Sequence, residues 1–218
     1  MVAPSVDKLP LVSGHPALDL VNTVEPRLPV TGRHEHLAGP DDLLAWAQRA
    51  TLIGEKEAVA VEAAWAADPP AGASALTAVH QIREALAAAL DAILDSAPDR
   101  SGLALDYLSL RWGAAAARSR LVPDQRGVRL AVGSAPAELI PDRAVAAAVS
   151  LLCDADLAYL GICPPGEHGC GWLFLDRSKN RSRRWCTMND CGAHAKAQRL
   201  TERRRAARAS AVSHNGGS

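Results

Sequence analysis

The sequence has few aromatic residues and no long apolar run. Phe, Trp and Tyr make up 4% of the 218 residues, and Phe occurs once. Its apolar stretches are far shorter than the roughly 20 residues that cross a bilayer, so we expect no membrane span. The N-terminal segment has no basic head followed by an apolar stretch, so we expect no secretory signal and a cytoplasmic protein. Cysteines stay reduced in that compartment, so the five present predict metal ligands or free thiols rather than disulfides.

Motifs typical of enzymes are also missing. The sequence contains no phosphate-binding loop, no nucleophile and base within a recognisable motif, and no paired catalytic carboxylates. We therefore expect a protein that is not an enzyme.

The chain has no net charge, yet its charges are unevenly distributed. It contains 24 Lys and Arg and 24 Asp and Glu. Residues 163–208 carry eleven of the basic residues and four of the acidic ones, a net charge of +7, which leaves −7 for the rest of the chain. This asymmetry predicts that one end of the protein binds a polyanion.

Apolar periodicity predicts a mainly α-helical N-terminal domain over residues 1–160. We expect helices at about 41–49, 55–67, 74–96, 103–118 and 137–160, and a buried Cys153 on the last of them. Apolar and polar residues alternate on both sides of residues 124–127, which predicts a small β-hairpin. Residues 210–218 are expected to form a disordered tail.

Four of the cysteines predict a zinc module over residues 161–209. Their spacing is C-x6-C-x15-C-x4-C, and they are Cys163, Cys170, Cys186 and Cys191. Four thiolates complete a tetrahedral zinc ion and leave no open position, which predicts one structural Zn²⁺. Two alternatives remain at this stage: four thiols without metal, or a histidine ligand, His168 or His194, in place of one cysteine.

The 15 residues between Cys170 and Cys186 have room for two short strands. Trp172 and Phe174 would lie on the first strand and Trp185 on the returning strand. A basic helix would start at Cys191, so the module is expected to resemble a treble clef.

Basic residues of this module are candidates for binding double-stranded DNA. They are Arg177, Arg181, Arg183, Arg184, Lys196, Arg199 and Arg203. Such a surface neutralises phosphates, and base contacts are expected from arginines close to the zinc, Arg183 or Arg184. The alternative is a protein- or RNA-interaction adaptor in which the zinc module is only a scaffold.

Some polar residues of the helical domain are candidate contacts for a small-molecule effector. They are Asn22, Thr23, Arg83 and Arg111. Their structural alternative is hydrogen bonding within the fold. A homodimer is also expected, because many regulators bind paired half-sites.

Two segments of the sequence carry resemblances to known families. The stretch RWCTMNDCG, preceded by CGWLFLDRSKNRSR and followed by a basic helix, resembles the CGNR zinc fingers of bacterial proteins. This resemblance implies that the four cysteines bind zinc and that the module binds DNA. Ala193 and His194 stand where the family motif has Asn and Arg, which puts part of that DNA contact in doubt.

The remainder of the chain resembles the ABATE domain that accompanies this finger. The resemblance lies in residues 18–23, in the helix at 41–49 and in residues 82–86. Together the two resemblances cover nearly the whole chain. They imply a stress-related transcription regulator whose helical domain acts as a sensor or dimerisation unit.

Overall fold

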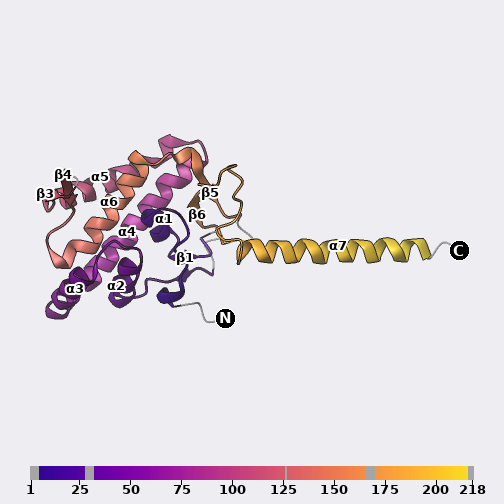
Figure 1. The fold of residues 1–218 in the computed structure, drawn as a ribbon, viewed down its shortest axis with the longest axis horizontal. Coiled ribbons are helices and arrows are strands. Elements are labelled where there is room, and N and C mark those ends of the chain that lie inside the picture. Colours follow the sequence, from indigo (N-terminus) through magenta and orange to yellow (C-terminus); the bar gives the residue numbers. More distant parts are fainter. Residues whose placement is uncertain (1–4, 28–31, 126, 165–169, 216–218) are drawn as a thin grey trace.

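The computed structural model describes residues 5–27, 32–125, 127–164 and 170–215, and in the last helix it describes side chains as far as Arg204. A bundle of helices leads into a small two-stranded unit, from which one long helix extends away (Figure 1). The prediction of a mainly helical fold with a small hairpin and a short-stranded zinc module is confirmed. Among the described residues, none of the helices combines the length and apolar character that a bilayer requires.

Five helices make up most of the bundle. They are α2 (Pro40–Arg49), α3 (Glu55–Ala67), α4 (Pro69–Leu94), α5 (Gly102–Ala117) and α6 (Leu139–Asp154). The long α4 lies at the centre and contacts each of the others as well as α1 (Pro16–Val21). Its buried stripe includes Val79, Ile82, Leu86 and Leu90, as the apolar period predicts.

α4 begins five residues earlier than the expected position 74. Pro69 and Pro70 lie in its first turn, where a missing backbone N–H costs nothing and the fixed φ of proline favours the helix. The segment Asp68–Pro70 therefore ends α3 and also begins α4.

α6 is shorter than the expected span of 137–160. It ends at Asp154, and the chain continues through a 3-10 turn (Leu157–Tyr159) into β5 (Leu160–Ile162). β5 pairs antiparallel with β6 (Leu173–Leu175), so tertiary pairing overrides the helical propensity of this segment. Cys153 is exposed rather than buried, because the inner face of α6 is formed by Val145, Ala148 and Leu151.

The β-hairpin predicted around residues 124–127 is confirmed. Strands β3 (Arg120–Asp124) and β4 (Gly127–Ala131) pair in the register Leu121 with Leu130 and Asp124 with Gly127. A second pair, β1 (Val24–Glu25) with β2 (His34–Glu35), lies against the bundle. Gly127 has a φ of 126°, a backbone conformation that side chains with a Cβ rarely adopt.

The C-terminal helix α7 (Cys191–Asn215) is longer than expected. Residues 210–215, which the sequence assigned to a disordered tail, continue this helix, and residues 216–218 lie outside the described part of the chain. Alanine and arginine, which favour helix, are frequent between residues 195 and 211.

Buried charges join α4 to the strand β2. The guanidinium of Arg83, which is 4% exposed, donates to both carboxylate oxygens of Glu35, at 2.7 and 2.6 Å. It also donates to Thr23 Oγ1 at 3.0 Å. Burial raises the pKa of Glu35, but the hydrogen bonds from Arg83 outweigh burial and hold this pKa below its usual value.

The stability of the fold should therefore depend on the charge of Glu35. The pKa of the Glu35 carboxyl is lower in the folded protein than in the unfolded chain, where it is about 4.3. Its charge therefore stabilises the fold at pH values above about 4.3, and this stabilisation is lost as the pH falls through the folded-state pKa. Glu35→Gln should lower the free energy of unfolding at pH 7 by about 2 kcal/mol, because Arg83 loses one of its two carboxylate partners and keeps only Glu84, whose Oε1 accepts from its Nε at 2.8 Å. Urea denaturation from pH 7 to pH 3 measures both effects; an equal loss on acidification in the variant would contradict the assignment.

Candidate metal centre

The four cysteines of the C-terminal module converge at one point. Their sulfur atoms all lie within 4.8 Å of one another, and all four residues are buried. Cys186 Sγ lies 3.4 Å from Cys170 Sγ and 3.5 Å from Cys191 Sγ. A tetrahedral zinc ion with Zn–S bonds near 2.3 Å separates its sulfurs by about 3.8 Å. The cluster fits a structural zinc ion with four cysteine ligands, and the predicted cofactor is confirmed.

The β5–β6 pair positions Cys163, and α7 positions Cys191. Cys163 directly follows β5, and its backbone N–H donates to the carbonyl of Trp172 at 2.8 Å, one step beyond the strand pairing. Gly161 allows the close packing of this pair, because a Cβ there would lie 2.7 Å from the Phe174 ring. Cys191 is the first residue of α7, as expected.

The strand order differs from the prediction. Both strands were expected between Cys170 and Cys186, with Trp185 on the second. The structure places only β6 there, and β5 precedes Cys163. The described residues 176–190 form turns and bends instead. The division at residues 160 and 161 therefore falls inside β5, so the module starts one strand earlier in the chain.

The thiols compete for protons in the absence of a cation. Hydrogen bonds from Cys170 and Cys186 lower the pKa of Cys163 to about 2. The hydrogen bond to Cys163 is the main cause that raises the pKa of Cys170 and of Cys186, and burial raises that of Cys191. Four thiolates this close require a divalent cation to offset their repulsion, so zinc binding must release protons.

Neither histidine alternative gains support. His194 lies on α7, outside the sulfur cluster, with its Nε2 3.5 Å from Asp190 Oδ1. His168 lies outside the described residues. The four-cysteine set therefore accounts for the whole coordination of the metal.

Arg183 is part of the framework of the module. Its Nε donates to the carbonyl of Trp185 at 3.1 Å, and its Nη2 donates to the carbonyls of Val12, at 2.8 Å, and Cys186. Its guanidinium also lies 4.3 Å from the centre of the Phe174 ring. The expectation that Arg183 reads bases stays a prediction, and in this structure its Nε and Nη2 donate to the chain itself.

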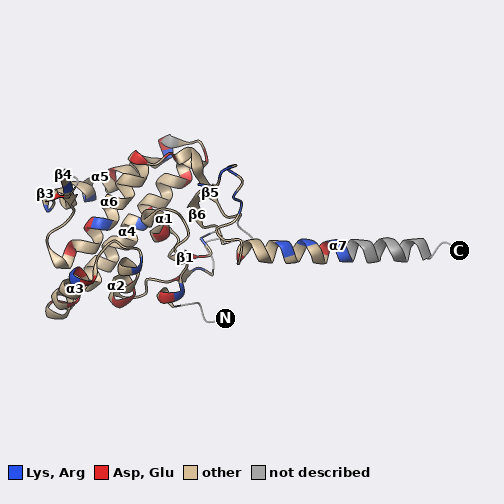
Figure 2. Ribbon diagram, in the orientation of Figure 1, with Lys and Arg blue, Asp and Glu red and all other residues tan. Residues whose placement is uncertain are grey.

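The other candidate DNA contacts are exposed. They are Arg177, Arg181, Arg184, Lys196, Arg199 and Arg203. The first three belong to the loop after β6 and the last three to α7, and both segments appear as basic regions in Figure 2. Arg181 stacks on the Tyr159 ring at 4.1 Å and donates to its hydroxyl group, a partner that sequence spacing did not reveal.

The module is joined to the helical domain by backbone pairing. Asn22, which is 2% exposed, donates through Nδ2 to the Leu173 carbonyl at 2.8 Å and accepts from the Leu173 amide at 2.9 Å. The Leu175 amide donates to the Ser13 carbonyl at 2.8 Å, and the Arg27 amide to the Cys170 carbonyl at 2.9 Å. The zinc module therefore packs directly against the helical domain.

The four effector candidates do not form a ligand site. Asn22 is bound to β6, and Thr23 Oγ1 donates to the Leu20 carbonyl and accepts from Arg83. Arg111 lies on α5 and faces Glu138, with 3.9 Å between the charged atoms. Their structural alternative, hydrogen bonds and ion pairs within the fold, describes Asn22, Thr23 and Arg83 better, whereas the buried Nε of Arg111 has no hydrogen-bond partner among the described residues.

Replacing one ligand should abolish stoichiometric zinc. Cys186→Ser is expected to bind less than one zinc per chain and to melt at a lower temperature, because the remaining thiols cannot close the tetrahedron. Cys153→Ser is the matched control, since Cys153 is exposed and lies outside the cluster. Elemental analysis and thermal melting measure both effects. Full zinc occupancy in Cys186→Ser would contradict the assignment.

Neighbouring arginines should differ in what they stabilise. Arg183→Ala should lower the free energy of unfolding by about 3 kcal/mol, because three carbonyl groups lose a charged donor. Arg184 is exposed, and Arg184→Ala should change it by less than about 0.5 kcal/mol. Chemical denaturation of the zinc-loaded variants makes the comparison. Equal effects of the two substitutions would show that the hydrogen bonds of Arg183 do not stabilise the module.

Comparison with known families agrees with this geometry. Residues 160–204 match the CGNR zinc finger. Residues 14–155 match the ABATE family, described as "Putative stress-induced transcription regulator". No curated protein sequence matches the chain. The second match covers more than half of the 218 residues, so the chain belongs to the ABATE family and carries a CGNR zinc finger after its ABATE domain.

Proposed function

We propose that this protein is a transcription regulator that binds double-stranded DNA through α7 and the loop after β6. The observation that carries the proposal is that α7 extends away from the domain without a packing partner over its described, basic part (Figures 1 and 2). Only Cys191, Gly192 and Ala195 are buried among its residues 191–204. Helices usually gain their stability from packing, so this one is suited to a partner outside the chain.

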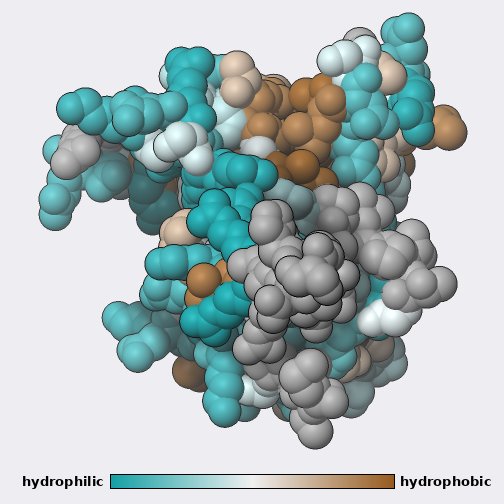
Figure 3. Space-filling view, turned by 90° about the vertical axis from the view of Figure 1, so that its right-hand side faces the viewer, coloured by the Kyte–Doolittle hydropathy of each residue, from teal (hydrophilic) through white to brown (hydrophobic). Residues whose placement is uncertain are grey.

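The chemistry of α7 favours a nucleic acid as that partner. Lys196, Arg199 and Arg203 are exposed and follow one another at three and four residues, so they lie on one face. At 1.5 Å per residue, 25 residues extend about 37 Å, close to one turn of DNA. The major groove, about 12 Å wide, admits such a helix. Hydrophilic residues lie on several sides of α7 in Figure 3, beside one hydrophobic patch.

The loop after β6 is suited to the phosphate backbone. Arg177, Lys179 and Arg181 line a hollow of about 350 Å³ together with Tyr159. The carboxylate of Asp176 accepts from the amides of Ser178, at 2.8 Å, and Arg183, at 3.0 Å. Hydrogen bonds from Ser178 and Arg183 lower the pKa of Asp176 and fix the loop. The loop thus presents its cations from a rigid turn, as a phosphate contact requires.

The proposal includes a homodimer and leaves out a small-molecule effector. Paired copies would bind paired half-sites. An effector is left out because three of the four residues expected to contact it, Asn22, Thr23 and Arg83, are hydrogen-bonded within the chain. Neither matched family is described as an enzyme.

DNA binding should depend on salt through the cations of α7. Lys196→Ala combined with Arg199→Ala should reduce the slope of log K against log salt by about 1.8, because each lost phosphate contact removes about 0.9. Lys56→Ala, on the exposed surface of α3, is the matched control and should leave the slope unchanged. Fluorescence anisotropy with zinc-loaded protein and random-sequence duplex DNA, from 50 to 200 mM salt, measures the slope.

The same assay separates the proposal from the adaptor alternative. Absence of affinity for any duplex at low salt, in protein that holds its zinc, would overturn DNA binding. Capture of single-stranded RNA or of a protein under those conditions would then identify the adaptor.

A further inference from the structure

A short segment of the helical domain, residues 22–27, lies along the backbone that begins at the zinc ligand Cys170. At one end of this segment, the amide of Arg27 donates to the carbonyl of Cys170 at 2.9 Å. At the other end, Asn22 bonds both backbone groups of Leu173, at 2.8 and 2.9 Å. The two stretches run in opposite directions, so residues 22–27, here called the platform segment, support the backbone of a metal ligand from one side.

The contact between the platform segment and the ligand backbone excludes water. The side chain of Trp172, a residue that is 3% exposed, donates through Nε1 to the carbonyl of Val24 at 3.3 Å. Cys170 and Val24 are buried as well. Hydrogen bonds in such a place are costly to lose, because each group would be left in the interior without a partner. The position of Cys170 therefore depends on the position of the platform segment.

The platform segment is anchored in turn on the central helix α4. The guanidinium of Arg27, a residue that is 7% exposed, donates to Glu84 Oε2 and to the carbonyl of Val21, both at 3.2 Å. Arg83 donates to Thr23 Oγ1, within the platform segment, at 3.0 Å. Arg83 and Glu84 are neighbours on α4. Two side chains of the central helix thus fix the segment that supports a zinc ligand.

Glu84 supplies the counter-charge that keeps the guanidinium of Arg27 inside the fold. Burial lowers the pKa of Arg27, and the charge of Glu84 opposes this effect. Burial raises the pKa of Glu84, but the charges of Arg27 and Arg83 outweigh burial and hold this pKa below its usual value. A buried guanidinium that loses its counter-charge is strongly destabilised and shifts toward water. Because the amide of the same residue bonds Cys170, this shift would reach the metal site.

We propose that Arg27 and Glu84 are positioning residues of the zinc site, so that the helical domain sets how tightly the zinc module binds its metal. Neither belongs to the sulfur cluster, and both act through the backbone of Cys170. Groups that orient metal ligands from outside the coordination sphere change metal affinity by about 10- to 100-fold. Such coupling is reciprocal, so zinc stabilises the platform segment by the same free energy by which the segment favours zinc.

This coupling connects the helical domain to the functional end of the molecule. Cys191 is a ligand of the same metal and the first residue of α7, so loss of zinc would release α7 from its attachment. A change at Arg27 or Glu84 would thus alter the retention of the metal first and the placement of α7 second. The effect on the metal is independent of DNA binding, whereas its use in regulation rests on the proposed function.

Glu84→Gln tests the coupling. The substitution keeps the size of the side chain and removes its charge, and the side chain is 46% exposed, so the chain should still fold. The zinc dissociation constant of the full-length protein should rise about tenfold, because the backbone of Cys170 is less well fixed. Competition with a chromophoric chelator under reducing conditions measures this constant, and far-UV circular dichroism checks the fold.

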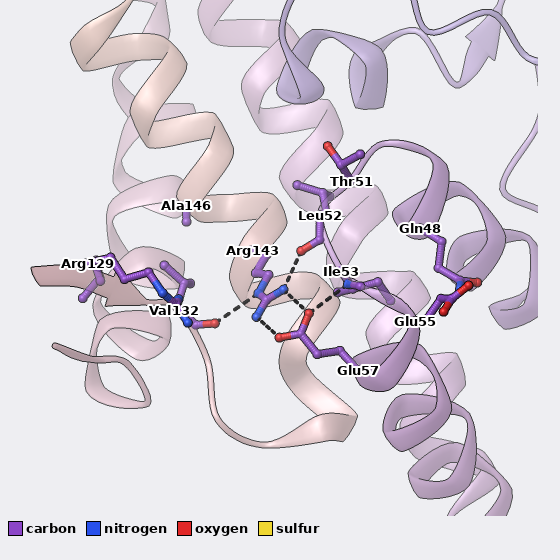
Figure 4. A pocket seen from close by; sticks show the side chains of 12 residues that line it. Gln48, Thr51, Leu52, Ile53, Glu55, Glu57, Arg129, Val132, Arg143 and Ala146 are labelled. Atoms are coloured by element: carbon purple, nitrogen blue, oxygen red, sulfur yellow. Dashed lines mark hydrogen bonds and ion pairs between the residues drawn. The ribbon is translucent and has the colours of Figure 1, made fainter. Parts of the chain in front are cut away.

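Glu57→Gln is the matched control. Glu57 pairs with Arg143 in a cleft of about 740 Å³ between the turn from α2 to α3 and the β3–β4 hairpin, at the end of the domain remote from α7 (Figures 1 and 4). Its side chain is 40% exposed, and it accepts from the Arg143 guanidinium through both oxygens. This variant loses an ion pair of the same kind, yet its zinc dissociation constant should stay within about twofold of the wild-type value, because the two sites are far apart.

Arg27→Met tests whether Glu84 acts through Arg27. This substitution keeps the backbone amide and the aliphatic part of the side chain, and it should also weaken zinc binding about tenfold. Combined with Glu84→Gln, it should weaken zinc binding no further than it does alone, because both changes remove the same ion pair.

Three outcomes would overturn the proposal. The first is an unchanged zinc affinity in folded Glu84→Gln. The second is an equal loss of affinity in Glu57→Gln, since general destabilisation of the helical domain would then be responsible. The third is additive losses from Arg27→Met and Glu84→Gln, which would show that the two residues act separately. DNA is absent from all of these measurements, so failure of the proposed function would appear only in the duplex-binding assay.

Discussion

The tetrahedron of sulfur atoms is the constraint on which the functional end of the molecule depends. It joins three segments: the β5–β6 pair, the loop that follows it, and the first turn of α7. β6 is buried in the same core as the helices, whereas the loop and the first turn of α7 are held mainly by the metal, so metal binding contributes to the stability of this end. The zinc also fixes the direction in which α7 leaves the molecule, because Cys191 is both a ligand and the first residue of that helix.

The zinc module and the helical domain form one structural unit. Asn22 satisfies both backbone groups of Leu173, and Arg183 connects the loop before Cys186 to the carbonyl of Val12. These contacts bury polar groups that would otherwise be left without partners, so separating the two parts would cost several hydrogen bonds at once. A change within the N-terminal segment can therefore alter the position of the metal site.

The two ends of the molecule have different surface chemistry. One end carries exposed cations on a rigid loop and on a helix without a packing partner, which suits a polyanion (Figure 2). The other carries an exposed apolar hairpin beside a preformed cleft with acidic residues across it. The two surfaces lie at opposite ends of the molecule (Figure 1).

The sequence by itself determined the zinc ligands, most helices and the hairpin, because ligand spacing, apolar period and turn residues are local patterns. The tertiary structure decided which strand pairs with Leu173–Leu175. The actual partner strand lies about 13 residues earlier in the chain, and nothing in the sequence pattern distinguishes it from the segments that directly follow Leu175. It also decided that Arg183 binds backbone carbonyl groups while Arg184 is exposed to solvent, although the two are neighbours with the same side chain. Such roles depend on carbonyl groups supplied by residues as distant as Val12, and only folding brings those groups together.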